Sequence, residues 1–206
     1  RSELWTFYKS PAEWERQKIE PQKKDAFSFG TAFHTLAMQP ELWDEEITVI
    51  ESNRLTKAFK AECEKYPDAL IISSAEELQI IEMCRSINDP SVFNFDCWHD
   101  FIWGAEIEQS YFWIDEPTGL LLKCRIDLSK GNVIADLKSA KDASPSGFSK
   151  SIADYGYHFQ AAYYLDGVNY IEDNHFNTFR LFPVEKKEPY HPACYDLGPV
   201  SIDIGR

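Results

Sequence analysis

Two apolar segments that run into acidic residues constrain this chain more than any other feature. Residues 119–127 are mostly apolar, follow a turn sequence and end in an aspartate, which predicts a strand. Val133–Ala135 predict a second, buried strand, and Asp136, Leu137 and Lys138 follow directly. Because side chains alternate along a strand, the first and third residues of this triplet share one face and the leucine points into the core. A carboxylate and an ammonium group therefore share a surface.

An acid-x-Lys triplet is a weak signal by itself, because Glu185–Lys187 forms a second one between prolines and predicts only a strand end or turn. The structural alternative for Asp136 and Lys138 is an ion pair at a strand edge. The aspartate at the end of the neighbouring segment, Asp127, favours a site instead.

Cleavage of a phosphodiester needs an activated water, a shielded phosphate and a stabilised leaving oxygen, and a divalent metal supplies most of this chemistry. Asp127, Asp136 and the backbone carbonyl of Leu137 offer the oxygen ligands that Mg²⁺ prefers. A protonated Lys138 is no ligand, and its expected role is to orient the attacking water and offset phosphate charge. The pattern indicates a metal-dependent nuclease site.

Further polar residues flank these segments. Glu106–Trp113 predicts the hairpin partner of the first strand, and Glu106, Glu108 and Ser110 share one of its faces by period two. A further carboxylate could thus face the site, although either glutamate could equally be a solvated edge residue.

Downstream, a helical pattern places the polar ends of Gln160 and Tyr164 on one face, together with Tyr157 and Ala161. The alternative is a core-facing helix with buried tyrosines. Other expected elements are helices from Ser10-Pro11, from Ser74 to about 87, from Ser144-Pro145 and across 157–169, and a strand near 176–183.

The Asp-Leu-Lys and Gln-x-x-x-Tyr motifs in residues 136–164, together with Asp127 and Gly30–His34, resemble the PD-(D/E)XK motifs of RecE-like exonucleases. The similarity covers most of the chain and is weakest between residues 45 and 100. It implies an α/β fold with a restriction-endonuclease-like PD-(D/E)XK core, in which helices flank a mixed central β-sheet.

The resemblance also implies the site. By pattern alone, His34 lies at the margin of an apolar helical stripe and is consistent with a core histidine, whereas in RecE-like enzymes this position is a metal ligand. The family's additional acid matches Glu108, with Glu106 as the fallback. The cofactor would be Mg²⁺, or Mn²⁺, with two ions per site. The expected metal ligands are His34, Glu108, Asp127, Asp136 and the Leu137 carbonyl. The expected catalytic residues are Glu108, Asp127, Asp136 and Lys138, and the expected substrate-binding residues are Gln160, Tyr164, Lys141 and Lys150.

The activity implied by the resemblance is 5′-to-3′ exonuclease digestion of double-stranded DNA from its ends in phage-type recombination. It also implies a single-strand annealing protein as partner and a ring-like homo-oligomer around DNA. Two other classes stay open: a PD-(D/E)XK endonuclease with the same site, and a catalytically silent DNA-binding or scaffold module.

Net charge separates these possibilities poorly, because a value of −13 is unusual for a protein that binds nucleic acid. The charge is uneven, since residues 123–150 hold six basic and three acidic residues and the rest of the chain carries −16. A positively charged region around the site, on an otherwise acidic surface, would steer DNA toward the site. The alternative is that the acidic charge serves only to keep the protein soluble.

Composition and length are those of one nuclease domain over residues 1–206, with 44% hydrophobic residues to form a core. The absence of a membrane-length apolar run and of a signal-peptide pattern leads us to expect a cytoplasmic protein with no membrane partner. Five scattered cysteines without a Cys-x-x-Cys pair argue against a disulfide framework or zinc finger. Residues 200–206 alternate like a strand and stop without a cap, so we expect a chain truncated at its C-terminus.

Overall fold

The computed structural model describes residues 2–19, 25–66, 69–92, 95–172 and 175–206. The helices are α1 Ser2–Lys9, α2 Pro11–Ile19, α3 Asp25–Met38, η1 Pro40–Leu42, α4 Trp43–Glu46, α5 Lys57–Cys63, α6 Ser74–Asn88, α7 Phe95–Ile102, α8 Pro145–Tyr155, α9 Tyr157–Ile171 and α10 Pro199–Gly205. The strands are β1 Ile47–Ile50, β2 Leu70–Ser73, β3 Glu106–Asp115, β4 Leu120–Lys130, β5 Val133–Ala140, β6 Thr178–Glu185 and β7 Tyr195–Asp196.

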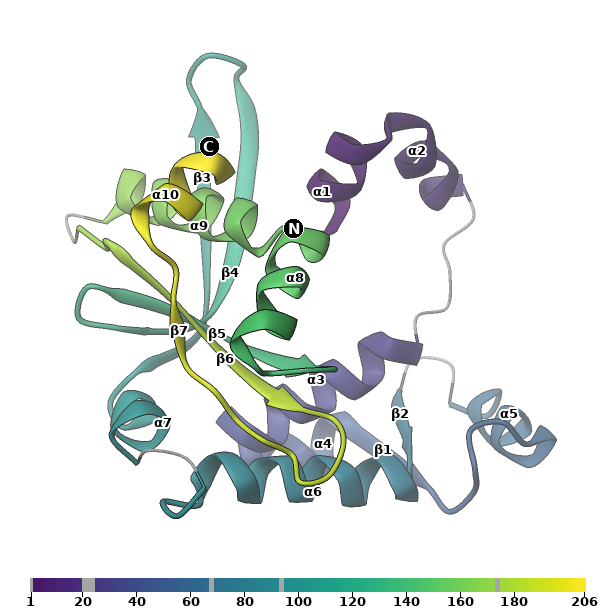
Figure 1. Ribbon diagram of the computed structural model, residues 1–206. Coiled ribbons are helices and arrows are strands. Elements are labelled where there is room, and N and C mark those ends of the chain that lie inside the picture. The colour runs from purple at the N-terminus through teal and green to yellow at the C-terminus, as the bar shows by residue number, and fades with distance from the viewer. Residues whose placement is uncertain (1, 20–24, 67–68, 93–94, 173–174) are drawn as a thin grey trace.

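A five-stranded sheet of order β3-β4-β5-β6-β7 forms the centre of the molecule (Figure 1). Its neighbours pair antiparallel except β5 and β6, which are parallel, so the sheet is mixed as the sequence predicted. A β-hairpin joins β3 to β4 through a turn in which the Gly119 amide donates to the Asp115 carbonyl. This turn needs a left-handed residue, and Gly119 has a φ of 69°. A separate parallel pair, β1 and β2, lies outside this sheet.

The crossover from β5 to β6 runs through two helices, as parallel neighbours require. The Ser144 hydroxyl accepts the Gly147 amide and caps α8, with Pro145 at the first helical position. Gly156, in the left-handed region at φ 67°, ends α8 and starts α9. The expected helices from Ser144-Pro145 and across 157–169 are thus confirmed, as is the strand near 176–183.

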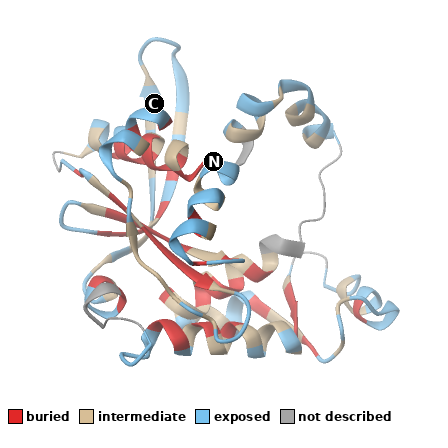
Figure 2. Ribbon diagram, viewed as in Figure 1, coloured by how far each residue is buried: buried red, intermediate tan, exposed pale blue. Residues whose placement is uncertain are grey.

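One face of the sheet packs against helices α3, α6 and α7. Phe33 of α3, Ile80 of α6 and Trp98 of α7 form a core with Leu137 of β5 and Phe182 of β6. All five residues are at most 2% exposed, which explains the buried bands along these elements in Figure 2. The sheet side of this core is therefore shielded from water by helices that precede it in the chain.

The other face packs against the C-terminal helices. Phe148 of α8, Leu165 of α9 and Ile202 of α10 form a second core with Ile134 of β5 and Phe179 of β6. Adjacent residues of β5 and β6 thus alternate between the two cores, which is the strand periodicity inferred from the sequence. Helices flank the sheet on both sides, so the expected α/β architecture is confirmed.

The C-terminal segment is a correction, because residues 199–205 form helix α10 and not the strand that their alternation suggested. Pro199 occupies the first helical position and Ile202 is buried against α9. Gly205 approaches α9 so closely that a Cβ atom would lie 2.2 Å from the His158 carbonyl oxygen. Tertiary packing therefore overrides the two-residue pattern.

Smaller expectations also have outcomes. Helix α2 begins at Pro11 after a capping Ser10, as predicted, and α6 begins at Ser74 with a capping box between Ser73 and Glu76. Cys63, Cys84, Cys124 and Cys194 are free thiols, and the Cys97 side chain lies outside the described part. Among the described residues, helices long and apolar enough to cross a membrane are absent.

Candidate metal and active site

The candidate site lies where β4 and β5 stop pairing. Their register runs only from Lys130–Val133 to Leu128–Ala135, and the next residue along each strand is an aspartate, Asp127 or Asp136. Asp127 replaces the missing backbone pairing, because its Oδ2 accepts the Leu137 amide at 3.0 Å. The divergence of two central strands thus opens room for side-chain chemistry at an interior position of the sheet.

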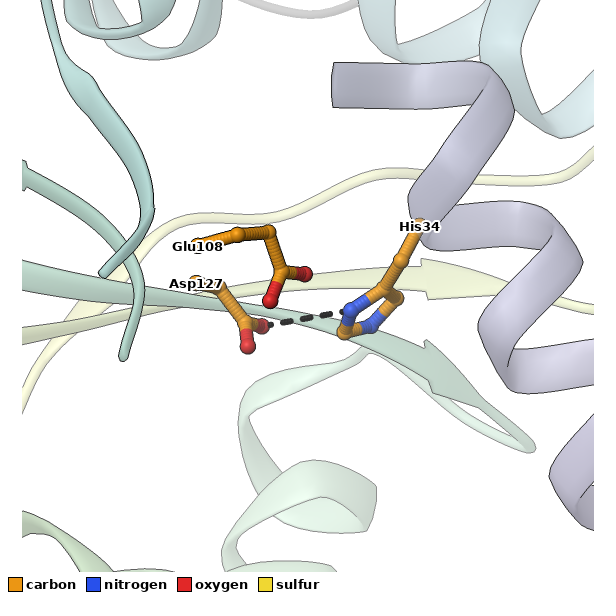
Figure 3. Close-up of side chains that lie close together, drawn as sticks. All are labelled: His34, Glu108 and Asp127. Atoms are coloured by element: carbon orange, nitrogen blue, oxygen red, sulfur yellow. Dashed lines mark ion pairs between the residues drawn. The ribbon is translucent and has the colours of Figure 1, made fainter. Parts of the chain in front are cut away.

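Three potential ligands converge at this point. The imidazole of His34 and the carboxylates of Glu108 and Asp127 offer ligand atoms that all lie within 4.8 Å of one another. Figure 3 shows the three side chains pointing toward each other, with His34 coming from α3 and the two acids from the β3–β4 hairpin. Each residue is half-buried, so the cluster is partly shielded yet open to solvent.

The hydrogen bonding of His34 fixes the role of each ring nitrogen. Nε2 lies 2.8 Å from the Leu137 carbonyl oxygen, an acceptor, so Nε2 carries the proton. In the neutral ring, Nδ1 then presents a lone pair toward Asp127 Oδ2, 3.5 Å away. Two acceptors facing each other at this distance are satisfied by a cation between them, which is how metal-binding histidines are commonly oriented. The donor set therefore fits a divalent metal.

Backbone strain aims Glu108 at this cluster. Its φ is 55°, in the left-handed region that a glutamate rarely adopts. At this point the inward-facing side chains of the hairpin pass from one core to the other. The pair Ile107–Leu128 packs in the first core, and the pair Tyr111–Cys124 packs in the second. Glu108 is half-buried whereas Glu106 is exposed, so the structure brings the former and not the latter to the cluster.

The electrostatics of Asp127 reflect crowding by acids. Burial first, then the neighbouring charge of Asp136 and more weakly that of Glu108, raise the pKa of Asp127, which is about 6. The charge of His34, when its ring is protonated, and that of Lys138 lower the same pKa without offsetting these effects. A carboxyl that is reluctant to ionise next to other ligand groups is typical of a functional site.

Asp136 has a different environment. It is 1% exposed and forms an ion pair with Lys138, while the amide of Gln160 donates to its Oδ1. The Nζ atom of Lys138 also lies 5.0 Å from the centre of the Tyr157 ring. Because β5 lies between β4 and β6, this ion pair is in the sheet interior and not at an edge. Asp136 lies outside the three-ligand cluster, although its charge acts on Asp127.

The expected substrate contacts of α9 need correction. Tyr164 is buried in the second core against Phe179, and Gln160 is buried with its amide directed at Asp136. Neither side chain is exposed to a substrate strand, so the alternative of a core-facing helix describes α9, and Gln160 supports the site from beneath. Lys141 and Lys150 are exposed, after β5 and on α8.

One neighbour of the site was missed. Arg125 forms an ion pair with Glu108. From the sequence, this arginine was considered only as one of the basic residues of positions 123–150. Its spacing of two residues from Asp127 on the same strand was the available signal, because such residues share a face.

The sheet order, the crossover helices and the paired aspartates define the PD-(D/E)XK class of nuclease folds. Residues 2–206 match the family described as "PDDEXK-like domain of unknown function (DUF3799)", and the chain belongs to this family. The fold is similar to the crystal structure of a provisionally assigned exonuclease from Eubacterium rectale, with a TM-score of 0.62 and 14% identity. That similarity covers 93% of this chain and 67% of the other. No curated protein sequence matches the chain.

Proposed function

We propose that this protein is a metal-dependent deoxyribonuclease that hydrolyses DNA phosphodiester bonds. The observation that carries the proposal is the convergence of His34 Nδ1 and the carboxylates of Glu108 and Asp127 at the point where β4 and β5 separate. A divalent ion, Mg²⁺ or Mn²⁺, supplies Lewis acidity that polarises phosphate oxygens and acidifies water. The Leu137 carbonyl holds the imidazole in the tautomer that presents Nδ1 to the ion.

The second half of the site positions the ammonium group. Asp136 holds Lys138 next to the cluster, and Gln160 fixes Asp136 from α9. An ammonium group held in a half-buried setting stabilises the charge that develops on a phosphate, and it can orient a water molecule. We assign Asp136 a positioning role and assign His34, Glu108 and Asp127 the binding of a first ion. A second ion would need Asp136 to release Lys138.

The finer proposal is a 5′-to-3′ exonuclease that acts on double-stranded DNA ends. It is supported by the sequence resemblance to RecE-like exonucleases and by the provisional assignment of the structural neighbour as an exonuclease. A single-strand annealing partner and a ring-like assembly belong to the same proposal. The exposed lysines Lys141 and Lys150 are its candidate phosphate contacts.

The test is digestion of linear and covalently closed duplex DNA in Mg²⁺ and in Mn²⁺, each compared with EDTA. Loss of linear DNA alone is expected, and cutting of closed circles would favour the endonuclease. Glu108→Gln removes a proposed ligand, and Glu106→Gln is a matched control two residues away that is exposed. Cleavage should be lost only in the former. Absence of cleavage, with absence of Mn²⁺ binding by calorimetry, would leave the silent module.

A further inference from the structure

The β3–β4 hairpin extends well beyond the candidate site, and one of its faces is open. Glu108 and Asp127 lie between the cross-strand pairs Ile107–Leu128 and Gln109–Ile126, and every second pair from there toward the turn shares one face. These pairs are Ser110–Arg125, Phe112–Lys123 and Ile114–Leu121. We call these six residues the open hairpin face.

The exposure of this face differs from that of its reverse. Phe112, Ile114 and Leu121 are 59%, 58% and 70% exposed and neighbour one another across the two strands. On the reverse side, Trp113 and Cys124 pack against α9 in the second core. Figure 2 shows the exposed end of the hairpin extending away from the buried sheet. Three neighbouring exposed apolar side chains on one strand pair mark a contact surface.

The reverse side of this face packs closely on α9. Gly167 of α9 lies so close to the Trp113 ring that a Cβ atom would be 2.3 Å from it. The Tyr163 hydroxyl, also on α9, donates to the backbone carbonyl of Lys123. The hairpin thus packs on the same helix whose Gln160 contacts Asp136, so α9 connects the open hairpin face to the site.

Charge selects the kind of partner. The chain carries −13, yet the two charged residues of the open hairpin face, Lys123 and Arg125, are both cations. Along the hairpin from the ligand cluster toward the turn, Arg125 comes first, Lys123 lies opposite Phe112, and Ile114 and Leu121 follow. Cations next to exposed aromatic and aliphatic side chains match a strand whose phosphates and unstacked bases are both accessible. Within an intact duplex the base faces are hidden by stacking.

We infer that the open hairpin face binds an unpaired nucleic-acid strand that leads into the candidate site, with Lys123 and Arg125 on phosphates and Phe112 against a base. This inference rests on the proposed function. It predicts that the protein binds single strands, and duplexes with a single-stranded overhang, more tightly than blunt duplexes of equal length.

The experiment measures fluorescence anisotropy of labelled single-stranded, overhang and blunt DNA in EDTA, where metal-dependent cleavage is stopped. Phe112→Ala should weaken single-strand and overhang binding about 5- to 50-fold, and Phe112→Trp should restore it, because base stacking is sequence-tolerant. Lys123→Ala should reduce the slope of log affinity against log salt by about one. Leu121→Ala should weaken binding less than Phe112→Ala.

Matched controls use exposed residues of the same type on other elements: Leu78→Ala on α6 for Leu121, and Lys57→Ala on α5 for Lys123. Binding with wild-type affinity by Phe112→Ala and Lys123→Ala would overturn the inference, and intact metal-dependent cleavage would then leave the proposed function standing. If binding depends on the hairpin residues but the protein does not cleave DNA, the inference would stand and the proposed function would fall.

Two further outcomes would also overturn the inference. Failure of the wild type to bind any of the three DNAs would remove the inference, and the metal-dependent cleavage assay would still decide the proposed function. A wild-type dimer by sedimentation that Phe112→Ala converts to a monomer, with DNA binding unchanged, would identify the face as a contact between two copies of this chain.

Discussion

Asp127 and Asp136 lie on neighbouring strands at the same opening in the sheet, yet their surroundings are opposite. Asp136 is neutralised within the protein by Lys138 and held by the Gln160 amide. Asp127 faces the lone pair of His34 and a second carboxylate, Glu108, and its pKa is raised to about 6. The charge of Asp136 is balanced by Lys138, and we call these two residues the compensated half of the site. The charge of Asp127 is not balanced in this way, and we call Asp127, His34 and Glu108 the uncompensated half.

The difference teaches how the site divides its work. The compensated half already contains a cation, Lys138, so its ion pair is formed in the metal-free protein and stabilises it. We expect the uncompensated half to lower the stability of the metal-free protein, and a bound cation would relieve that cost. Substitutions in the two halves should therefore change stability with opposite signs.

The largest effect is expected from Asp136→Ala. It leaves the Lys138 ammonium unpaired in a site where this side chain is only 13% exposed, so the free energy of unfolding should fall by about 3 kcal/mol. Cleavage should fall by about 10³-fold. Urea unfolding and a linear-DNA assay measure both. The double variant Asp136→Ala/Lys138→Met should regain stability but not cleavage, and a single variant as stable as wild type would contradict the compensated half.

Asp127→Asn should act in the opposite direction. It removes a carboxylate that burial and neighbouring acids disfavour, so in EDTA at pH 7.5 the variant should be about 1–3 kcal/mol more stable than wild type. Addition of Mn²⁺ should raise the melting temperature of the wild type and not of the variant. Thermal unfolding with and without Mn²⁺ tests both parts, and a destabilised variant in EDTA would show that the carboxylate is already satisfied.

The pH dependence sharpens the same contrast. Because the folded-state pKa of Asp127, about 6, exceeds its ordinary value of 3.8, its stabilising contribution is present at low pH. It is lost as pH rises through 6. Between pH 5 and 7.5, metal-free wild type should lose about 1–2 kcal/mol relative to Asp127→Asn. Parallel pH profiles of the two proteins in urea titrations would refute the assignment.

The smallest effect concerns the strained backbone at Glu108. Asparagine adopts the left-handed region more readily than glutamine, and both substitutions remove the carboxylate and its ion pair with Arg125. Metal-free Glu108→Asn should therefore be about 0.5–1 kcal/mol more stable than Glu108→Gln. Chemical denaturation of the pair isolates the backbone contribution, and equal stabilities would mean that φ is relaxed in solution.

Much of the fold was predictable because its signals are local. Turn residues around Gly119, alternation through Asp136 and Lys138, and the caps at Ser144 and Ser10 each specify an element from a few neighbouring positions. The same alternation placed the aspartate and lysine of β5 on one face, which the structure confirms. These signals do not depend on the rest of the chain.

The remaining features depend on contacts between distant residues. The left-handed conformation of Glu108 has no signal in a strand pattern, and the helix at 199–205 depends on close approach to α9. The inward direction of Gln160 and Tyr164 was left open, since periodicity gives a shared face but not whether that face meets substrate or core. The β1–β2 pair lies in the region where the resemblance was weakest.

The position of His34 has a consequence for the chain as a whole. Its helix, α3, belongs to the layer that packs on one face of the sheet, whereas Glu108 and Asp127 belong to the sheet. An ion shared by these residues would be a reversible cross-link between segments that are far apart in the sequence. Because its ligands come together only in the folded chain, such an ion would stabilise the protein by binding the folded state and not the unfolded one, unlike a disulfide, which persists on unfolding. Chelation would then loosen the attachment of α3 to the sheet.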